Sequence, residues 1–330
     1  MNNLELGVIW LGRMGGNLSL QAIEKGLRVV GYTSNGASAE LLAAGLEEVT
    51  AIEGFKEKLR APRVILLYIP AGPAVDEAID ALAAELEEGD IIADGGNSYW
   101  GDSIRRHGRM AARGIRFVDL GTSGGIDGAR HGACFMAGGS DDAVKVVEEL
   151  ATRLAVPGGF VYAGPAGMGH YVKLVHNGIE FGMLQAIGEG MEFLEYYKDQ
   201  IDVQGVLKCW RNGSVIRSWL IDLMEKEYRD NNGLGNIPTY IEDTGEVNWL
   251  VADALRMEIP IPVIAQSVMQ LFASRDEKKS WAGAIETMRH GFGGHPFGHY
   301  EPAKLERIEG RVGEIYKEPF PATGKKKKAA

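Results

Sequence analysis

The side chains most capable of chemistry in this sequence are an amine, an imidazole, an amide and a carboxyl within one short segment. They are Lys173, His176, Asn177 and Glu180, spaced i, i+3, i+4 and i+7. At about 100° per residue, this spacing puts all four on one face of a helix. Such a stripe is often a solvated face, but apolar residues occupy most of the remaining circumference here. We therefore expect a buried, central helix whose polar face lines an active-site cavity.

Burial would change the proton affinity of two of these groups. A low-dielectric environment disfavours charged forms, so it lowers the pKa of a lysine and raises the pKa of a glutamate. Lys173 would then accept a proton near neutral pH, and Glu180 would donate one. The alternative is a purely structural contact between the two side chains.

A second segment has the spacing of a nucleotide-binding loop, G-x-G-x-x-G, with tryptophan at the first glycine position. The segment consists of Trp10, Leu11, Gly12, Arg13, Met14 and Gly15. In the intact motif the glycines form the turn, admit the pyrophosphate and allow close helix–strand packing. We expect the loop to bind a dinucleotide at the N-terminus of a helix that begins near Met14. The indole of Trp10 occupies the place of a turn glycine, so we expect it to affect the affinity of the loop for a dinucleotide.

The end of the second apolar stretch should lie near the adenosine ribose. An acid there is typical of NAD sites, and an arginine is typical of NADP sites. The residues present are Thr33, Ser34 and Asn35, which are also ordinary turn formers. The sequence therefore leaves the choice between NAD and NADP open.

The hydrophobic pattern predicts the elements that position these groups. Strands are expected at residues 6–10, 28–32, 64–69, 91–94 and 115–120, with helices at 18–25, 74–86 and 103–113. Crossovers of this length favour a parallel sheet with helices on both faces. From about Met168 the pattern is helical. We expect a dinucleotide-binding α/β domain over residues 1–163, an all-helical domain over 164–309 and a flexible tail over 310–330.

Composition excludes other classes of protein. The 330 residues include 35 Lys+Arg and 45 Asp+Glu, a net charge of −10, which argues against nucleic-acid binding. Cys134 and Cys209 are far apart and lack metal-ligand spacing, so neither a disulfide framework nor a metal site is expected. Without a signal-like start or a stretch of about 18 apolar residues, we expect a cytoplasmic protein with no membrane partner. Four terminal lysines favour a solvated end.

Several separated motifs resemble those of 6-phosphogluconate dehydrogenases, in the same order and over most of the chain. They lie at residues 94–98 (DGGNS), 119–125 (DLGTSGG), 173–180 (KLVHNGIE), 211–220 (RNGSVIRSWL) and 289–295 (RHGFGGH). The length is similar to that of the shorter bacterial form. The resemblance implies a Rossmann-like N-terminal domain, an all-helical C-terminal domain and a homodimer or homotetramer with a shared active site.

The resemblance also implies an activity. The C3 hydroxyl of 6-phosphogluconate would be oxidised by hydride transfer to NAD or NADP, and loss of CO2 would leave ribulose 5-phosphate. Lys173 corresponds to the general base, and Glu180 to the acid that protonates C1 of the enediol. The positions implied to bind substrate are Asn97, Ser123, Gly124, Gly125, His176, Asn177, Arg289 and His295. Arg289 and His295 would reach the neighbouring subunit's substrate. The positions implied to border the cofactor, besides the glycine loop, are Thr33, Ser34, Pro70, Ala71 and Asn97.

Four departures from the family pattern concern the substrate's terminal phosphate. Where the family has tyrosine, a basic residue, threonine and arginine, this chain has Phe181, Asn248, Leu250 and Leu271. Each charge-assisted bond is worth about 1.5–3 kcal/mol when made, so their loss would weaken a phosphate site. Two alternatives therefore stay open: a non-phosphorylated or otherwise substituted sugar acid as substrate, and a non-catalytic nucleotide-binding or redox-sensing module.

Overall fold

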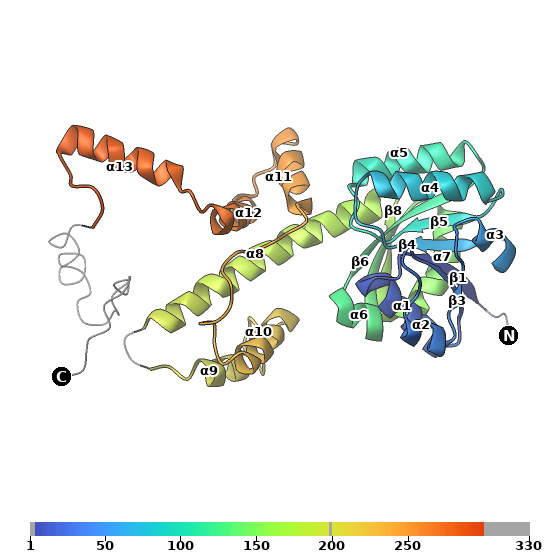
Figure 1. Cartoon of the computed structure of the whole chain (residues 1–330), viewed down its shortest axis with the longest axis horizontal. Helices are drawn as coiled ribbons and strands as arrows, with labels where there is room; N and C mark the ends of the chain where they lie inside the picture. The colour runs from blue at the N-terminus through green and yellow to red at the C-terminus, as the bar shows by residue number, and fades with distance from the viewer. Residues whose placement is uncertain (1–3, 198–199, 300–330) are drawn as a thin grey trace. The chain divides into compact units, whose positions relative to one another are not determined.

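The computed structural model describes residues 4–197 and 200–299, with a sheet in the first half and helices in the second (Figure 1). The strands are β1 (Glu5–Ile9), β2 (Arg28–Tyr32), β3 (Glu47–Glu48), β4 (Val64–Leu67), β5 (Ile91–Asp94), β6 (Arg116–Ser123), β7 (Ala133–Gly138) and β8 (Ala155–Gly164). The helices among them are α1 (Arg13–Glu24), α2 (Ala39–Ala44), α3 (Gly54–Lys58), α4 (Pro73–Glu85), α5 (Trp100–Ala111), α6 (Gly125–His131) and α7 (Asp141–Leu154). The later helices are α8 (Met168–Tyr196), α9 (Val203–Trp210), α10 (Trp219–Asp230), α11 (Glu246–Arg256), α12 (Pro262–Arg275) and α13 (Ser280–Gly293).

The sheet has the strand order β3-β2-β1-β4-β5-β6-β7-β8. Its first six strands are parallel, whereas β7 is antiparallel to β6 and parallel to β8. The carboxyl ends of β1, β4, β5 and β6 therefore share one edge. The strand order reverses between β1 and β4, which is where open α/β sheets bind their ligands.

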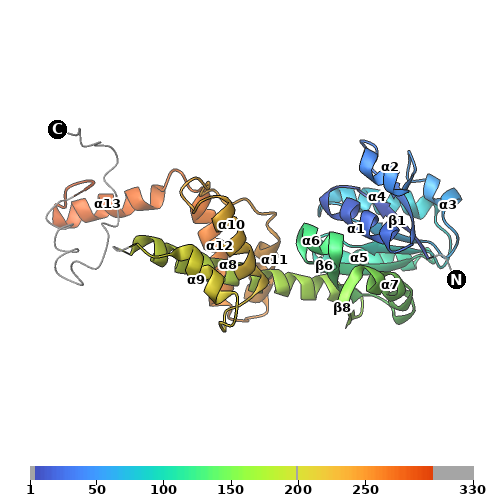
Figure 2. The same ribbon diagram turned by 90° about the horizontal axis from the view of Figure 1, so that it is seen from below.

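Alternation of apolar residues along the strands builds a core on each face of the sheet. Val64 and Leu66 of β4 pack into the core that includes α1 and α7, and Ile65 and Leu67 pack into the other, with α4. In Figures 1 and 2, α4 and α5 lie on the face of the sheet opposite α1 and α7. This arrangement follows from the two-residue period of a strand covered on both sides.

The Rossmann-like sheet followed by helices confirms the predicted fold class, and all five predicted strands are present. The five predicted strands are parallel as expected, whereas β7, which was not predicted, runs antiparallel to β6. Its small residues, read as ACFMAG, do not stand out as a strand in the sequence. The edge strand β8 contains a proline and three glycines and is largely exposed, so it also lacks a buried-strand pattern.

The chain folds into two compact units, and the first of them is built from two separate stretches of sequence. It consists of Met1–Gly178 with Gly245–Ile259, and the second unit of Ile179–Thr244 with Pro260–Ala330. Helix α11 thus belongs with the sheet. The predicted boundary at residue 164 stays a prediction, and the predicted tail at 310–330 lies outside the described residues. No helix of the described ranges is long and apolar enough to cross a membrane.

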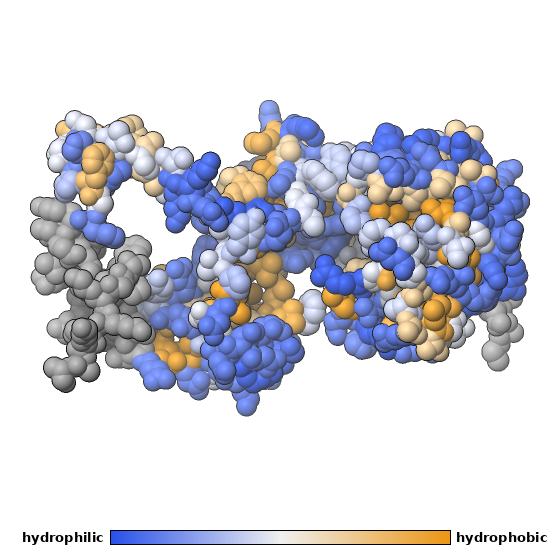
Figure 3. All heavy atoms as spheres, viewed as in Figure 1, coloured by the Kyte–Doolittle hydropathy of each residue, from blue (hydrophilic) through white to orange (hydrophobic). Residues whose placement is uncertain are grey.

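The environment of α8 differs from the expected buried, central helix. Within the single chain Val172, Ile179, Met183 and Leu184 are exposed, so apolar packing does not enclose the helix on all sides. The second unit also exposes apolar residues, and Figure 3 shows hydrophobic residues, in orange, at the surface over α13. Lys173 and Glu180 are half-buried and so are only partly withdrawn from solvent.

Candidate functional site

Five of the predicted site residues form one hydrogen-bonded cluster in the first unit. Lys173 Nζ donates to Asn177 Oδ1 at 2.7 Å, and Asn177 Nδ2 donates to Asn97 Oδ1 at 3.2 Å. His176 lies beside both, with Nδ1 at 3.4 Å from Lys173 Nζ, and its Nε2 is 3.0 Å from Ser123 Oγ. The cluster thus joins α8 to the loop after β5 and the end of β6.

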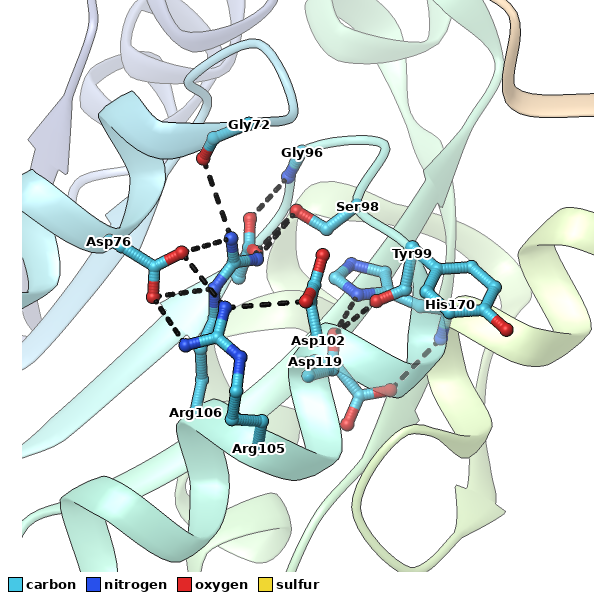
Figure 4. Close-up of polar contacts among 12 residues, drawn as sticks. Gly72, Asp76, Gly96, Ser98, Tyr99, Asp102, Arg105, Arg106, Asp119 and His170 are labelled. Carbon is cyan, nitrogen blue, oxygen red and sulfur yellow. Dashed lines mark hydrogen bonds and ion pairs between the residues drawn. The ribbon is translucent and has the colours of Figure 1, made fainter. Parts of the chain in front are cut away.

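A buried carboxylate fixes the loop that carries Asn97. Asp94 ends β5 with no exposed surface and accepts hydrogen bonds from Gly96 N at 3.1 Å and Ser98 Oγ at 2.7 Å (Figure 4). Arg106 of α5 approaches the same carboxylate at 3.4 Å. Because the charge is satisfied from both sides of Asn97, the loop has a defined conformation from which the amide reaches Asn177.

The neighbouring strand uses a second buried carboxylate to position α8. Asp119 is the register partner of Asp94 and accepts from the backbone N–H groups of Gly167 at 2.7 Å and His170 at 2.9 Å. A carboxylate at a helix N-terminus satisfies N–H groups that have no intrahelical partner and interacts favourably with the helix dipole. The imidazole of His170 is 2.7 Å from Ser103 Oγ, which also links α8 to α5.

Three glycines let α8 approach the sheet at backbone contact. A Cβ on Gly121 of β6 would lie 2.6 Å from Lys173 Cβ, and one on Gly138 of β7 would lie 2.6 Å from Gly169 N. A Cβ on Gly169 would overlap the carbonyl oxygens of Asp119 and Met136. Only glycine fits at these contacts, which place Lys173 directly beside the end of β6.

Helix α11 is attached to the same region through one buried acid. Asp253 accepts from Tyr99 Oη at 2.9 Å and from Trp100 Nε1 at 2.8 Å. Tyr99 and Trp100 immediately follow the loop that carries Asn97, and Trp100 packs edge-on against Tyr171 of α8. These contacts tie α11, with Asn248 and Leu250, to the elements that carry the cluster.

The glycine loop has the local structure of a dinucleotide site. Gly12 is the N-cap of α1 and has no side chain that could compete with a phosphate for the first N–H groups. A Cβ on Gly15 would overlap the Trp10 carbonyl, so the close turn requires glycine there. The loop also lies at the reversal of the strand order. These residues would fit the pyrophosphate of a dinucleotide.

Trp10 adopts the backbone conformation that the missing glycine would favour. Its φ is +76°, in the left-handed region, and its N–H donates to Tyr32 O at 2.8 Å. The indole Nε1 lies 3.0 Å from the position of a Cβ on Gly12, and the side chain remains 42% exposed. The tryptophan thus keeps the turn at a conformational cost of about 1–2 kcal/mol and covers part of the loop.

Replacing Trp10 with glycine is expected to tighten cofactor binding. Glycine adopts φ of +76° without strain and uncovers Gly12, so the dissociation constants for NADH and NADPH should fall severalfold. Titration of the reduced cofactors by fluorescence would measure this, with Trp249→Phe as a control for lost indole fluorescence. An unchanged or larger dissociation constant would contradict the role given to Trp10.

The other predicted cofactor positions lie on loops at the same edge of the sheet. Thr33 and Ser34 follow β2 in a turn closed by Gly36 N and Thr33 O at 3.2 Å. Pro70 and Ala71 are exposed between β4 and α4. This placement is compatible with a dinucleotide lying across the carboxyl ends of the strands, and the individual contacts stay predictions.

The remaining predicted catalytic and substrate-binding residues divide between the two units. Gly124 and Gly125, with φ of +115° and +59°, form the turn into α6 beside Ser123. Glu180 follows Lys173 by two turns on α8 but belongs to the second unit, as do Arg289 and His295, which are exposed on and after α13. Roles for these three residues stay predictions.

An acidic residue in the first turn of α4 gives a pH dependence that can be measured. Burial opposes ionisation of Asp76, yet hydrogen bonds from Arg105 and Arg106 hold its pKa well below the usual value. Its stabilising contribution is complete above the unfolded-state pKa of about 3.9 and is lost as pH falls toward the folded-state pKa. The destabilisation caused by Asp76→Asn should therefore be largest near neutral pH and shrink below pH of about 4.

Urea unfolding of the wild-type protein and the variant between pH 3 and 7 checks this expectation. Asp102→Asn removes an exposed partner of Arg105 and is the matched control, expected to change stability little at any pH. A deficit for Asp76→Asn that is the same at pH 3 and 7 would show that its ion pairs contribute nothing.

Sequence reasoning missed the residues that position the cluster. Asp94, Ser98 and Asp119 lie within the motifs of the resemblance, but no role was predicted for them, and Arg106 and Asp253 were not singled out. The available signal was an acid within each of two largely apolar strands, because a buried charge requires partners. The partners themselves come from other elements and could not be identified by spacing.

Comparison with known proteins matches both parts of the chain to one family. Residues 5–164 match the NAD binding domain of 6-phosphogluconate dehydrogenase, and residues 169–279 match its C-terminal domain. The chain is 42% identical to the putative 6-phosphogluconate dehydrogenase YqeC of Bacillus subtilis over 88% of this chain and 98% of that protein. It is 38% identical to an NAD(+)-dependent, decarboxylating 6-phosphogluconate dehydrogenase of Haloferax volcanii, with the same coverages.

Solved structures agree with this assignment. The 6-phosphogluconate dehydrogenase of Plasmodium falciparum, studied with its cofactor NADP+ and its substrate 6-phosphogluconate, has a TM-score of 0.74 and 28% identity, covering 93% of this chain and 68% of that chain. A 3-hydroxyisobutyrate dehydrogenase of Salmonella typhimurium has a TM-score of 0.70 at 19% identity, over 83% of this chain and 95% of that chain, and shows the shared fold. Since both domains match in order and two relatives align over nearly their full length, the chain belongs to the 6-phosphogluconate dehydrogenase family.

Proposed function

We propose that this protein oxidises and decarboxylates 6-phosphogluconate to ribulose 5-phosphate and CO2, with NAD or NADP as the hydride acceptor. The observation that carries the proposal is the hydrogen-bonded chain from Lys173 through Asn177 to Asn97. Three segments far apart in the sequence supply an amine, an amide pair and, through His176, a hydroxyl at the carboxyl edge of the sheet. The polar residues of a solvated helix face would bond to water and would not need hydrogen bonds to two other segments of the chain.

In the first step Lys173 acts as the base. A neutral Lys173 amine can donate one hydrogen to Asn177 Oδ1 and keep its lone pair for the proton of the C3 hydroxyl. Removal of that proton and departure of the C3 hydride convert the alcohol to a ketone. The nicotinamide supplies the hydride acceptor when it is bound to the Gly12–Gly15 loop.

In the second step the β-keto acid loses CO2. The electrons of the broken C1–C2 bond form an enediol once the C3 oxygen regains a proton, which the protonated Lys173 can return. Protonation at the terminal carbon then gives the ketose, a step we assign to Glu180. Asn97, His176 and Ser123 bind the carboxylate and hydroxyls in this scheme, because amide, imidazole and hydroxyl groups can satisfy both.

A steady-state assay that crosses NAD and NADP with 6-phosphogluconate and gluconate tests the proposal. Equimolar CO2 and reduced cofactor are expected, with higher kcat/KM for the phosphorylated acid. The assay also settles cofactor preference, which Thr33 and Ser34 leave open. Failure to produce CO2 from either acid would favour the alternative of a non-catalytic nucleotide-binding or redox-sensing module.

A non-phosphorylated or otherwise substituted sugar acid is the second candidate substrate, and α11 supports it. Leu250 is only 8% exposed, and Asn248 is exposed but uncharged, so neither position offers a cation to a terminal phosphate. Equal or higher kcat/KM for gluconate in the same assay would select this substrate class. The cytoplasm is the proposed location, because Cys134 and Cys209 are both free.

We also propose a homodimer or homotetramer in which Arg289 and His295 complete a neighbouring subunit's site. Large apolar side chains such as Phe193, Trp281 and Phe292 are 63–79% exposed in the single chain, which favours burial against a second copy. Mixing inactive Lys173→Met and Arg289→Ala proteins under subunit exchange should then restore activity, to about a quarter of wild type for a symmetric dimer. No recovery despite exchange would show that each chain contains its whole site.

A further inference from the structure

The most completely buried cation of the first unit's core is Arg106 of α5, which is 1% exposed. Its guanidinium contacts four groups on two different segments (Figure 4). Nη1 donates to Ser98 Oγ at 3.2 Å and to Asp94 Oδ2 at 3.4 Å. Nη2 donates to Asp76 Oδ2 at 2.9 Å and to the Gly72 carbonyl at 3.5 Å.

The two segments are the connections that leave adjacent strands at the ligand-binding edge. Gly72 is the N-cap of α4 and Asp76 lies in the first turn of that helix, shortly after Pro70 and Ala71. Asp94 ends β5 and Ser98 lies before α5, so the two residues flank Asn97. Strands β4 and β5 pair in parallel, so both connections begin at the same edge of the sheet. A single planar group therefore links a segment expected to border the cofactor with the segment that carries an amide of the cluster.

The chemistry of the contacts requires an arginine. A guanidinium presents five N–H donors in a rigid plane, and here they are divided between the two connections. A lysine ammonium carries the same charge but is a compact donor group on a flexible stem, so it cannot reach both in the same geometry. Mere neutralisation of Asp94 would not require contacts to a hydroxyl and a backbone carbonyl as well.

We propose that Arg106 is a positioning residue that holds the 70–76 and 94–98 connections in register, so that Asn97 and the cofactor-bordering turn present a preformed site. The relation to cofactor and substrate rests on the proposed function, whereas the linkage of the two connections does not. Preorganisation of this kind lowers the ordering cost of binding and keeps reacting groups in place.

The experiment compares Arg106→Lys with Arg105→Lys. Arg105 is the adjacent residue and also contacts Asp76, but it is 50% exposed and does not reach the 94–98 connection in the described structure. Hydrogen–deuterium exchange of the protein without cofactor or substrate should show amides of both connections in Arg106→Lys exchanging at least about tenfold faster, with the sheet amides unchanged. Arg105→Lys should resemble wild type. In the same proteins, the dissociation constant for reduced cofactor should rise and kcat should fall only for Arg106→Lys.

Two results would overturn the proposal: faster exchange spread over the whole sheet, which marks general destabilisation, or unchanged exchange at both connections. If Arg106→Lys does not fold, Asp76→Asn weakens the contact of the guanidinium with the 70–76 connection. Because Arg106 joins Asp76 to Asp94 and Ser98, exchange should then accelerate at 94–98 as well as at 70–76, and unchanged exchange at 94–98 overturns the proposal. Because exchange is measured without ligands, it tests the linkage even if the assay with sugar acids shows no turnover. If the wild-type protein turns over neither acid while the exchange results are those expected, the proposed function is wrong and the linkage of the two connections stands.

Discussion

Replacing Lys173 with methionine is expected to lower kcat by about 10²- to 10⁴-fold while leaving the fold intact. Methionine keeps the length and apolar stem of the side chain but cannot accept a proton. Asn177 loses one donor, yet it retains its hydrogen bond to Asn97, so the cluster should persist in part. Steady-state kinetics with the preferred cofactor and sugar acid measure the effect, and thermal unfolding reports the fold.

Lys145→Met is the matched control, because this lysine is exposed on α7 of the same unit. It should leave kcat and stability close to wild type. Lys173→Arg adds a further test, since a guanidinium keeps the positive charge but does not lose its proton in proteins. Near-normal kcat in either Lys173 variant would remove this residue from proton transfer.

Alanine in place of Gly169 is expected to destabilise the protein by about 1–3 kcal/mol or more, or to prevent folding. The added Cβ would overlap the backbone oxygens of Asp119 and Met136, and backbone atoms of two paired strands cannot move aside as a flexible side chain could. Any folded variant must shift the start of α8, so kcat should fall as well. Urea unfolding and steady-state kinetics measure the two effects.

Gly188→Ala on the same helix provides the comparison. A Cβ there meets no atom within 4 Å among the described residues, and alanine favours a helix by about 0.5–1 kcal/mol over glycine. This variant should be as stable as wild type or more stable. Equal stabilities for the two glycine variants would show that α8 does not depend on backbone contact with the sheet.

Local pattern sufficed for the fold class and for the members of the cluster on α8, whereas Asn97 and Ser123 were expected only from the resemblance to a known family. The continuous apolar run at Val64–Leu67 marks a strand covered on two faces, and helical spacing places Lys173, His176 and Asn177 together. The sequence could not show which residues position the cluster, because each buried carboxylate and the groups that donate hydrogen bonds to it come from separate elements. Asp119 binds N–H groups some 50 residues later, and no spacing rule relates the two.

The surroundings of α8 and the backbone of Trp10 could not be predicted from the sequence for a different reason. The apolar circumference of α8 predicted enclosure within the chain, whereas residues such as Ile179 and Met183 are exposed in a single copy. A hydrophobic pattern states that a surface must be covered but not which molecule covers it. For Trp10, the pattern showed a missing glycine, yet only the backbone angles show that the tryptophan takes the left-handed conformation itself.

The return of α11 to the first unit constrains how the protein can be dissected. A fragment that stops at Gly178 would lack Asp253 and would leave Tyr99 and Trp100 without their hydrogen-bond acceptor, next to the loop with Asn97. Isolating the nucleotide-binding half by truncation would therefore damage the very edge under study. A fragment that keeps these contacts has to join residues 245–259 to residues 1–178 through an artificial linker.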